Sequence, residues 1–429
     1  MNDVPRSTIV PEGPKELVDG STAGILKFLA PSQTEWREIR PNTSSISNEE
    51  ERKKIEDKAK KSKEVLDEML LSSLQMPNLV VLAGSGTSLG EVGGPSMRDL
   101  WKYAIEDETG TPSANAKKIM EKVKFDMERE GNNIEALLSQ CEAYLQIDED
   151  SNVSDFVERC KEFTLKKCSE FLKDKSTGAW LDEKLKAHCT FLHRLSRRRV
   201  RDPRLKVFTT NYDLCFERAA GLQSLIITDG FSYTKPRIFD PRYFGYDFVR
   251  RPQATVEHGD YLEGVFHLLK LHGSVNWART NDGRIEEKDG PTPAEACLIY
   301  PAKGKYQQSY IQPHLELISQ YLASLREPNT CFIVVGFGFN DDHLSEPILA
   351  AVTTNPRLRL IVADFMAEDS IKSEVNNYWR ELCSLANNGE DIWFINASFK
   401  DFAYLIPDLR TLTPAQQLEK AIRNVRGSQ

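Results

Sequence analysis

The stretch that decides the fold is Asn78-Leu-Val-Val-Leu-Ala-Gly-Ser-Gly-Thr-Ser88, which changes character halfway along. Its first half, through Ala83, is apolar and carries no charge, as is typical of a strand buried on both faces. Residues 84–88 are all glycine, serine or threonine. A buried strand that ends in a small-residue loop before a helix brings backbone N–H groups to a phosphate. We therefore expect a nucleotide loop here, with a plain tight turn as the competing interpretation.

The composition indicates an intracellular globular protein. The chain has 429 residues, a formal net charge of -8, 40% hydrophobic and 28% charged residues. The acidic balance argues against direct, non-specific binding of nucleic acid, and no apolar run approaches the length of a membrane helix. The first residues lack the apolar core of a signal peptide, so a cytoplasmic location is expected. None of the eight cysteines forms a Cys-x-x-Cys pair, so we predict reduced core cysteines and no metal site.

Apolar runs that alternate with helical segments predict an α/β fold with a Rossmann-like, doubly wound parallel sheet. After the first strand, strands are expected at 205–210, 224–229, 265–271, 330–337, 357–365 and 391–398. The helices between them are expected at 213–220, 341–352 and 368–385. Ligands of such sheets bind outside the carboxyl ends of the strands.

The remaining segments define the expected domain organisation. Residues 111–200 show only helical periodicity, which predicts an inserted helical subdomain. The irregular segments 230–262 and 275–313 are too long for simple loops and indicate a small module or lid without zinc. The chain is therefore divided into an N-terminal arm (1–46), the first part of the Rossmann domain (47–110), the helical insertion (111–200), the rest of the Rossmann domain (201–406) and a C-terminal helix or tail (407–429).

Three predicted strand ends carry polar residues that a core does not require. They are Thr209-Thr-Asn-Tyr-Asp213, Leu271-His-Gly-Ser274 and Gly336-Phe-Gly-Phe-Asn-Asp341. Each has an ordinary explanation when it is taken alone. Asn211 is a possible helix cap, His272 a structural histidine, and the two glycines a turn. Their joint occurrence with the loop at 84–88 favours one shared site.

These motifs together resemble the sirtuin family. The Gly84–Ser88 loop is similar to the sirtuin Gly-Ala-Gly-x-Ser loop, and Gly94-Pro-Ser-Met-Arg98 to its Gly-Ile-Pro-Asp-Phe-Arg segment. Asn211 falls at the asparagine of Thr-Gln-Asn, and His272-Gly273 at the catalytic His-Gly. Gly336-Phe-Gly-Phe339 occupies the adenosine-binding turn. The forms Thr-Asn-Tyr-Asp and Leu-His-Gly-Ser look like the bacterial sirtuin-like NAD hydrolases of phage defence.

The resemblance implies NAD as the substrate and assigns roles to particular residues. Asn211 and His272 are the expected catalytic residues: Asn211 orients the ribose or the attacking water, and His272 accepts a proton. The residues expected to bind NAD are Gly84, Ser85, Gly86, Thr87, Ser88, Arg98, Asp213, Gly336, Phe337, Gly338 and Asp364. Within this set, Asp213 is expected to fix the loop more than to touch the ligand.

The departures from the family pattern favour NAD hydrolysis over deacylation. Deacylases carry two Cys-x-x-Cys pairs after the catalytic histidine, whereas this chain has only Cys297 there. The resemblance also implies an effector of anti-phage defence that forms a homo-oligomer, with a HerA-type ATPase as a possible partner. Contact with nucleic acid is expected only through a partner, and none with membranes. The alternatives are an NAD- or ADP-ribose-sensing module, a deacylase, and a nuclease that acts with an ATPase.

Overall fold

A computed structural model describes residues 26–41, 43, 47–198, 202–250, 260–300, 312–373 and 376–408. A nine-stranded sheet forms its centre, in the order β2-β1-β14-β13-β12-β3-β4-β8-β5. In chain order, these strands are β1 (Leu26–Leu29), β2 (Arg37–Arg40), β3 (Asn78–Ala83), β4 (Leu205–Thr209), β5 (Ile226–Thr228), β8 (Val265–Lys270), β12 (Thr330–Val335), β13 (Leu358–Asp364) and β14 (Ile392–Asn396).

The strands from β14 to β5 are parallel, so the predicted doubly wound sheet is confirmed. The central strand β3 pairs with β12 on one side and β4 on the other, with Val81 opposite Ile333 and Val207. The chain builds the β4 side first and then crosses to β12, so the sheet has its topological switch point between β3 and β12. Ligands of open α/β sheets bind at such a point.

Helices cover both faces of the sheet, which explains why β3 is apolar on both sides. Val81 packs in the core beneath one helical layer, and Val80 and Leu82 pack beneath the other. The first layer contains α1 (Glu49–Leu74), α7 (Lys186–Leu195), α8 (Cys215–Leu222) and α14 (Phe399–Leu405). The second contains α10 (His314–Arg326), α11 (Asp342–Thr354), α12 (Ala367–Lys372) and α13 (Asn377–Asn387).

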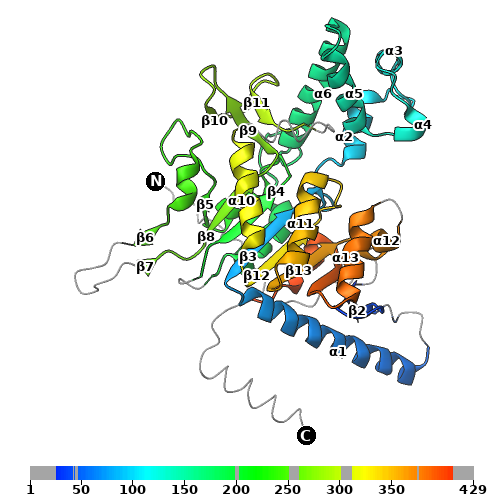
Figure 1. The fold of residues 1–429 in the computed structure, drawn as a ribbon, viewed down its shortest axis with the longest axis vertical. Helices are drawn as coiled ribbons and strands as arrows, with labels where there is room; N and C mark the ends of the chain where they lie inside the picture. The colour runs from blue at the N-terminus through cyan, green and yellow to red at the C-terminus, as the bar shows by residue number, and fades with distance from the viewer. Residues whose placement is uncertain are drawn as a thin grey trace.

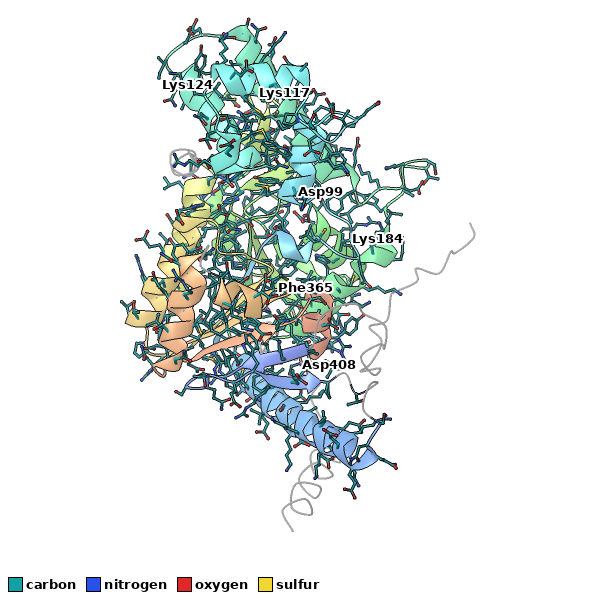
Figure 2. The ribbon with its side chains drawn as sticks, turned by 90° about the vertical axis from the view of Figure 1, so that its right-hand side faces the viewer. Asp99, Lys117, Lys124, Lys184, Phe365 and Asp408 are labelled. Atoms are coloured by element: carbon teal, nitrogen blue, oxygen red, sulfur yellow. The ribbon has the colours of Figure 1, made fainter. Side chains whose placement is uncertain are left out.

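The helical insertion forms a core of its own beyond one end of the sheet (Figure 1). It contains α3 (Ala114–Lys122), α4 (Met127–Glu130), α5 (Ile134–Leu145) and α6 (Ser151–Glu170). Helix α2 (Met97–Ile105), which was predicted as part of the Rossmann domain, packs in the same core. Trp101 of α2 is fully buried in this separate core. Helix α7 was predicted within the same insertion, but it packs on the sheet. Figure 2 shows Lys117 and Lys124 in the part of the insertion farthest from Phe365, which follows β13.

The segment after β8 contains a small three-stranded antiparallel sheet where the sequence indicated irregular structure. Its strands are β9 (Gly273–Arg279), β10 (Ile285–Glu287) and β11 (Ala296–Leu298), in the order β10-β9-β11. A short hairpin of β6 (Val249–Arg250) and β7 (Asp260–Tyr261) precedes it. Val275 and Leu298 of the small sheet share a buried cluster with Leu165 of α6. The small sheet thus lies against the helical insertion.

Some local structure differs from the sequence-based expectation. Strands β1 and β2 extend the main sheet, so residues 26–40 of the predicted arm belong to the Rossmann domain. Helix α10 was not predicted. Helix α1 is capped by the side chain of Asn48, which accepts from the N–H groups of Glu50 and Glu51. Residues 1–25 of the arm and 409–429 of the tail lie outside the described residues. No helix within the described ranges is long and apolar enough to span a membrane.

Candidate active site

The loops that carry the predicted site residues follow neighbouring strands and meet at the carboxyl edge of the main sheet. Residues 84–88 follow β3, Asn211 and Asp213 follow β4, and His272 follows β8. On the other side of the switch point, Gly336 follows β12 and Asp364 ends β13. Since β3, β4 and β8 are adjacent, three of these loops are neighbours at this edge.

The loop at 84–88 forms one short 3₁₀ turn that uses most of its own N–H groups. Gly84 N–H donates to Val335 O at 3.0 Å and Gly86 N–H donates to Gly336 O at 2.9 Å. The N–H groups of Thr87 and Ser88 donate to carbonyls inside the loop, Gly84 O and Ser85 O. Four of the five N–H groups are therefore occupied. Phosphate binding by this loop stays a prediction.

The glycines of this loop have a structural reason that the sequence did not reveal. A Cβ at Gly84 would lie 2.5 Å from Gly336 O, and a Cβ at Gly86 would lie 2.6 Å from Gly336 Cα. Gly336 itself has φ +58°, in the left-handed region that favours glycine. The loops after β3 and β12 thus pack backbone against backbone at the switch point. Their glycines permit this contact, whether or not a ligand also lies here.

Asn211 joins the loop after β4 to the loop after β3. Its Nδ2 donates to Thr87 Oγ1 and to Ser88 Oγ, both at 3.0 Å. Ser88 Oγ in turn donates to Asp213 Oδ2 at 2.6 Å, and Asp213 Oδ1 accepts from Cys215 N–H at 3.0 Å. Asp213 thus holds the loop in place, as expected. Because the amide nitrogen of Asn211 already donates to two hydroxyl groups of the protein, the side-chain carbonyl oxygen is the atom that Asn211 offers to a ligand.

Lys270 joins the Asn211 loop to the strand that carries His272. This buried side chain donates to Tyr212 O at 3.2 Å, to Asp213 O, and to Glu217 Oε1 at 2.8 Å. Lys270 ends β8 only two residues before His272. One ammonium group therefore fixes the backbone of the Asn211 loop relative to the His272 turn. This role of Lys270 was not predicted, because a lysine inside a predicted buried strand belongs to no recognisable motif.

His272 faces a second histidine from α11. Its Nε2 lies 3.4 Å from Nε2 of His343, and the two ring planes are 24° apart. His272 is 3% exposed, while His343 is partly exposed. His343 was not predicted, although it lies two residues after the motif that ends at Asp341. The only available signal was a histidine in the first turn of a helix after a strand end.

Tyr212, between Asn211 and Asp213, is enclosed by the small sheet and the helical insertion. Its hydroxyl donates to Ile299 O at 2.6 Å, and its ring packs with Leu165 of α6. Burial above all, with help from Cys168, Asp341 and Glu135, raises the pKa of Tyr212 well above its usual value. Tyr212 therefore stays protonated and acts as a fixed hydrogen-bond donor. Its neighbours show that α5, α6 and α11 all approach this side of the site.

The remaining predicted NAD-binding residues are spread more widely. Phe337 is buried and packs edge-to-face on Phe339, and Gly338 O accepts from Asn376 Nδ2 at 3.1 Å. Asp364 accepts from Met366 N–H at 2.8 Å, and burial raises its pKa. Arg98 is exposed on the first turn of α2. Their contact with a ligand stays a prediction.

No metal centre accompanies these residues in the described part of the chain. Across its ranges, no three His, Cys, Asp or Glu side chains are arranged to hold an ion. Cys297 instead lies with its Sγ 3.7 Å from His314 Nε2, and His314 Nδ1 lies 3.0 Å from Leu271 O. Burial raises the pKa of Cys297 to about 11 and lowers that of His314 to about 4, so both groups are neutral near pH 7.

Comparisons with known proteins identify the same segment. A family model described as a SIR2-like domain matches residues 205–384, which include Asn211, His272 and His343. No curated protein sequence matches the chain. A solved structure of a Sir2 enzyme is 13% identical over 75% of this chain and 96% of that one, with a TM-score of 0.34.

Two further solved structures give similar values. A Sir2 homologue in complex with NAD is 13% identical over 79% of this chain and 92% of that chain, with a TM-score of 0.39. A Sir2 homologue variant in complex with ADP-ribose is 13% identical over 79% and 94%, with a TM-score of 0.38. The family-model match supports a sirtuin-like assignment for the segment that carries Asn211 and His272.

Proposed function

We propose that this chain hydrolyses NAD⁺ to nicotinamide and ADP-ribose, with Asn211 and His272 at the reacting centre. The observation that carries the proposal is the hydrogen-bonded link from Asn211 to Thr87 and Ser88, which joins two strand-end loops beside the strand that bears His272. The SIR2-like match over residues 205–384 supports the same centre.

The chemistry requires little acid catalysis from the protein. The bond between C1′ of the ribose and the nicotinamide nitrogen breaks, its electrons go to the ring nitrogen, and neutral nicotinamide leaves. A water oxygen forms the new bond to C1′ and loses one proton, which the neutral imidazole of His272 accepts. The sum is NAD⁺ and water giving nicotinamide, ADP-ribose and one proton. A positioned base contributes about 10²–10⁴-fold to such a rate.

Access to this centre requires movement of the covering segments. Asn211 and His272 are 7% and 3% exposed, so a nicotinamide riboside reaches them only after a displacement of what covers them. The helical insertion and the small sheet approach Tyr212 between these loops. We therefore assign gating to these two segments. Such a gate keeps an enzyme that consumes NAD⁺ inactive until it is triggered.

The biological role that we propose is NAD⁺ depletion as an effector of anti-phage defence. Assembly into a homo-oligomer and pairing with a HerA-type ATPase are part of this proposal. They follow from the likeness of Thr210-Asn-Tyr-Asp213 and Leu271-His-Gly-Ser274 to bacterial sirtuin-like hydrolases. The N-terminal residues and the helical insertion are the segments that we assign to assembly or gating.

The test is NAD⁺ turnover by the purified full-length chain and by Asn211→Ala and His272→Ala. We expect nicotinamide and ADP-ribose in equal amounts, and a loss of at least about 100-fold in both variants. His267→Gln, at the start of the same strand β8, is the matched control and should keep wild-type turnover. Circular dichroism and thermal melting confirm that each variant is folded.

Two outcomes would replace the proposal with its alternatives. NAD⁺ binding by calorimetry without any nicotinamide release would indicate a sensing module. Nicotinamide release that depends on an added acetyl-lysine peptide would indicate a deacylase.

A further inference from the structure

The contact between His272 and His343 has the geometry of a hydrogen bond between two imidazoles. The ring centroids are 5.5 Å apart and the two Nε2 atoms are 3.4 Å apart. The difference between these two distances is close to twice the distance from a ring centroid to its own nitrogen. The two nitrogens therefore point at each other edge to edge, in planes 24° apart. Within the described residues, no third His, Cys, Asp or Glu side chain joins the two rings to form a metal site.

We propose that His343 is a positioning residue for His272, and that the two Nε2 atoms share one proton. This inference rests on the proposed hydrolysis for its kinetic consequence only. When the shared proton lies on Nε2 of His272, the water proton of the proposed hydrolysis goes to Nδ1 of His272, and His343 accepts the hydrogen bond from Nε2. After transfer, the pair carries one positive charge, and the N–H···N bond becomes charge-assisted and stronger. The neutral imidazole of His343 thus stabilises the imidazolium of His272.

The shared proton also limits how much charge the pair accepts. A second proton would place two cationic rings at this short separation, so the pair titrates as one coupled unit. Other titratable groups face this region from the packed elements. Asp341 is the N-cap residue of α11, Asp342 begins this helix, and Tyr212 follows β4. Glu135 of α5 acts on Tyr212 together with Asp341. Their charges act on the pair as a whole, whereas the bond between the rings depends on His343 alone.

Two substitutions of His343 distinguish the effect of its hydrogen bond to His272 from the effect of its own titration. His343→Gln keeps a neutral partner for His272 but removes the second ring, and His343→Leu removes the partner. Because the charge-assisted bond favours the protonated pair, its loss lowers the pKa of His272. In His343→Leu we expect the acid limb of kcat to move down by about one pH unit, and the plateau to fall about 10-fold. His343→Gln should recover most of the plateau. Asp342→Asn, an exposed neighbour, should keep the plateau, and any shift of its acid limb should be smaller than that of His343→Leu.

A second readout does not depend on turnover. In protein labelled with ¹⁵N-histidine, the Nε2 resonances of residues 272 and 343 are assigned by His272→Ala and His343→Leu and followed with pH. We expect the resonances to titrate together in the wild type and the remaining one to titrate alone, at lower pH, in His343→Leu. Independent titration of the two rings, unaffected by either substitution, would overturn the proposal. Absence of nicotinamide release by the wild type would contradict the proposed function and leave this readout decisive for the pair.

Discussion

His272 lies in the turn that follows β8, and His314 contacts the same turn from α10. The two rings nevertheless have chemically different neighbours. They are almost equally buried, at 3% and 4% exposed. The ring of His314 lies between a backbone carbonyl, Leu271 O, and the thiol of Cys297. The ring of His272 faces another imidazole, which is able to donate or accept a proton. Burial alone therefore does not distinguish the two histidines, whereas the chemistry of their partners does.

This comparison divides the residues around the turn into two groups. His314 and Lys270 support the backbone on either side of residue 271, and their loss should reduce stability. Asn211, His272 and His343 carry or arrange the proposed chemistry, and their loss should reduce turnover. Predictions that separate stability from turnover therefore test the division.

The largest expected effect on stability comes from Lys270→Met. The substitution removes the donor for Tyr212 O and Asp213 O and leaves Glu217 without its cation. Because the Glu217 side chain keeps 27% exposure, we expect a loss of about 2–3 kcal/mol in the free energy of unfolding. Urea denaturation measures it. Lys206→Met on the neighbouring strand, where one bond to Ser324 is lost, is the matched control and should cost less than about 1 kcal/mol. Equal losses would show that Lys270 has no special role.

A smaller effect is expected in the pH dependence of stability. Burial lowers the pKa of His314 from 6.5 to about 4, and those of His188 and His267 are also about 4. As the pH falls, these histidines take up protons in the unfolded chain before they do so in the folded protein. Their contribution to the free energy of unfolding is therefore fully present above pH 6.5 and is lost as the pH falls towards 4.

His314→Asn keeps an amide donor for Leu271 O and removes the titrating ring. Urea denaturation of this variant should show an acid slope that is shallower by about 1.4 kcal/mol per pH unit. Its turnover at pH 7 should stay within a few-fold of wild type. A slope equal to that of the wild type would mean that His314 is not buried as a neutral ring.

The parts of the fold that the sequence predicted are those with a strong local pattern. The apolar runs at 79–83, 331–335 and 360–363 identify strands that are buried on both faces, because such strands carry apolar residues on both sides. Asn211 and His272 were predicted because they are polar residues at strand ends. Their roles in binding or catalysis stay predictions.

The rest depends on contacts between residues far apart in the chain. His343 lies 71 positions from His272, and no local sequence pattern at either residue indicates that the two side chains are in contact. The glycines at 84 and 86 were predicted only as NAD-binding residues, and their close packing against the loop at Gly336 could not be read from the sequence. Strands β1 and β2, with four residues each and little apolar pattern in β2, are recognisable only by their pairing with β14 and with each other.

The central claim is that the loops after β3, β4 and β8 surround one nicotinamide riboside. A crystal structure of folded His272→Ala soaked with NAD⁺ tests it most directly, because the substitution should permit binding without turnover. The account predicts density for the nicotinamide riboside between the loop at 84–88, the carboxamide of Asn211 and the position of residue 272. Density for NAD⁺ elsewhere on the molecule, or an unoccupied site when calorimetry shows that NAD⁺ binds, would contradict it.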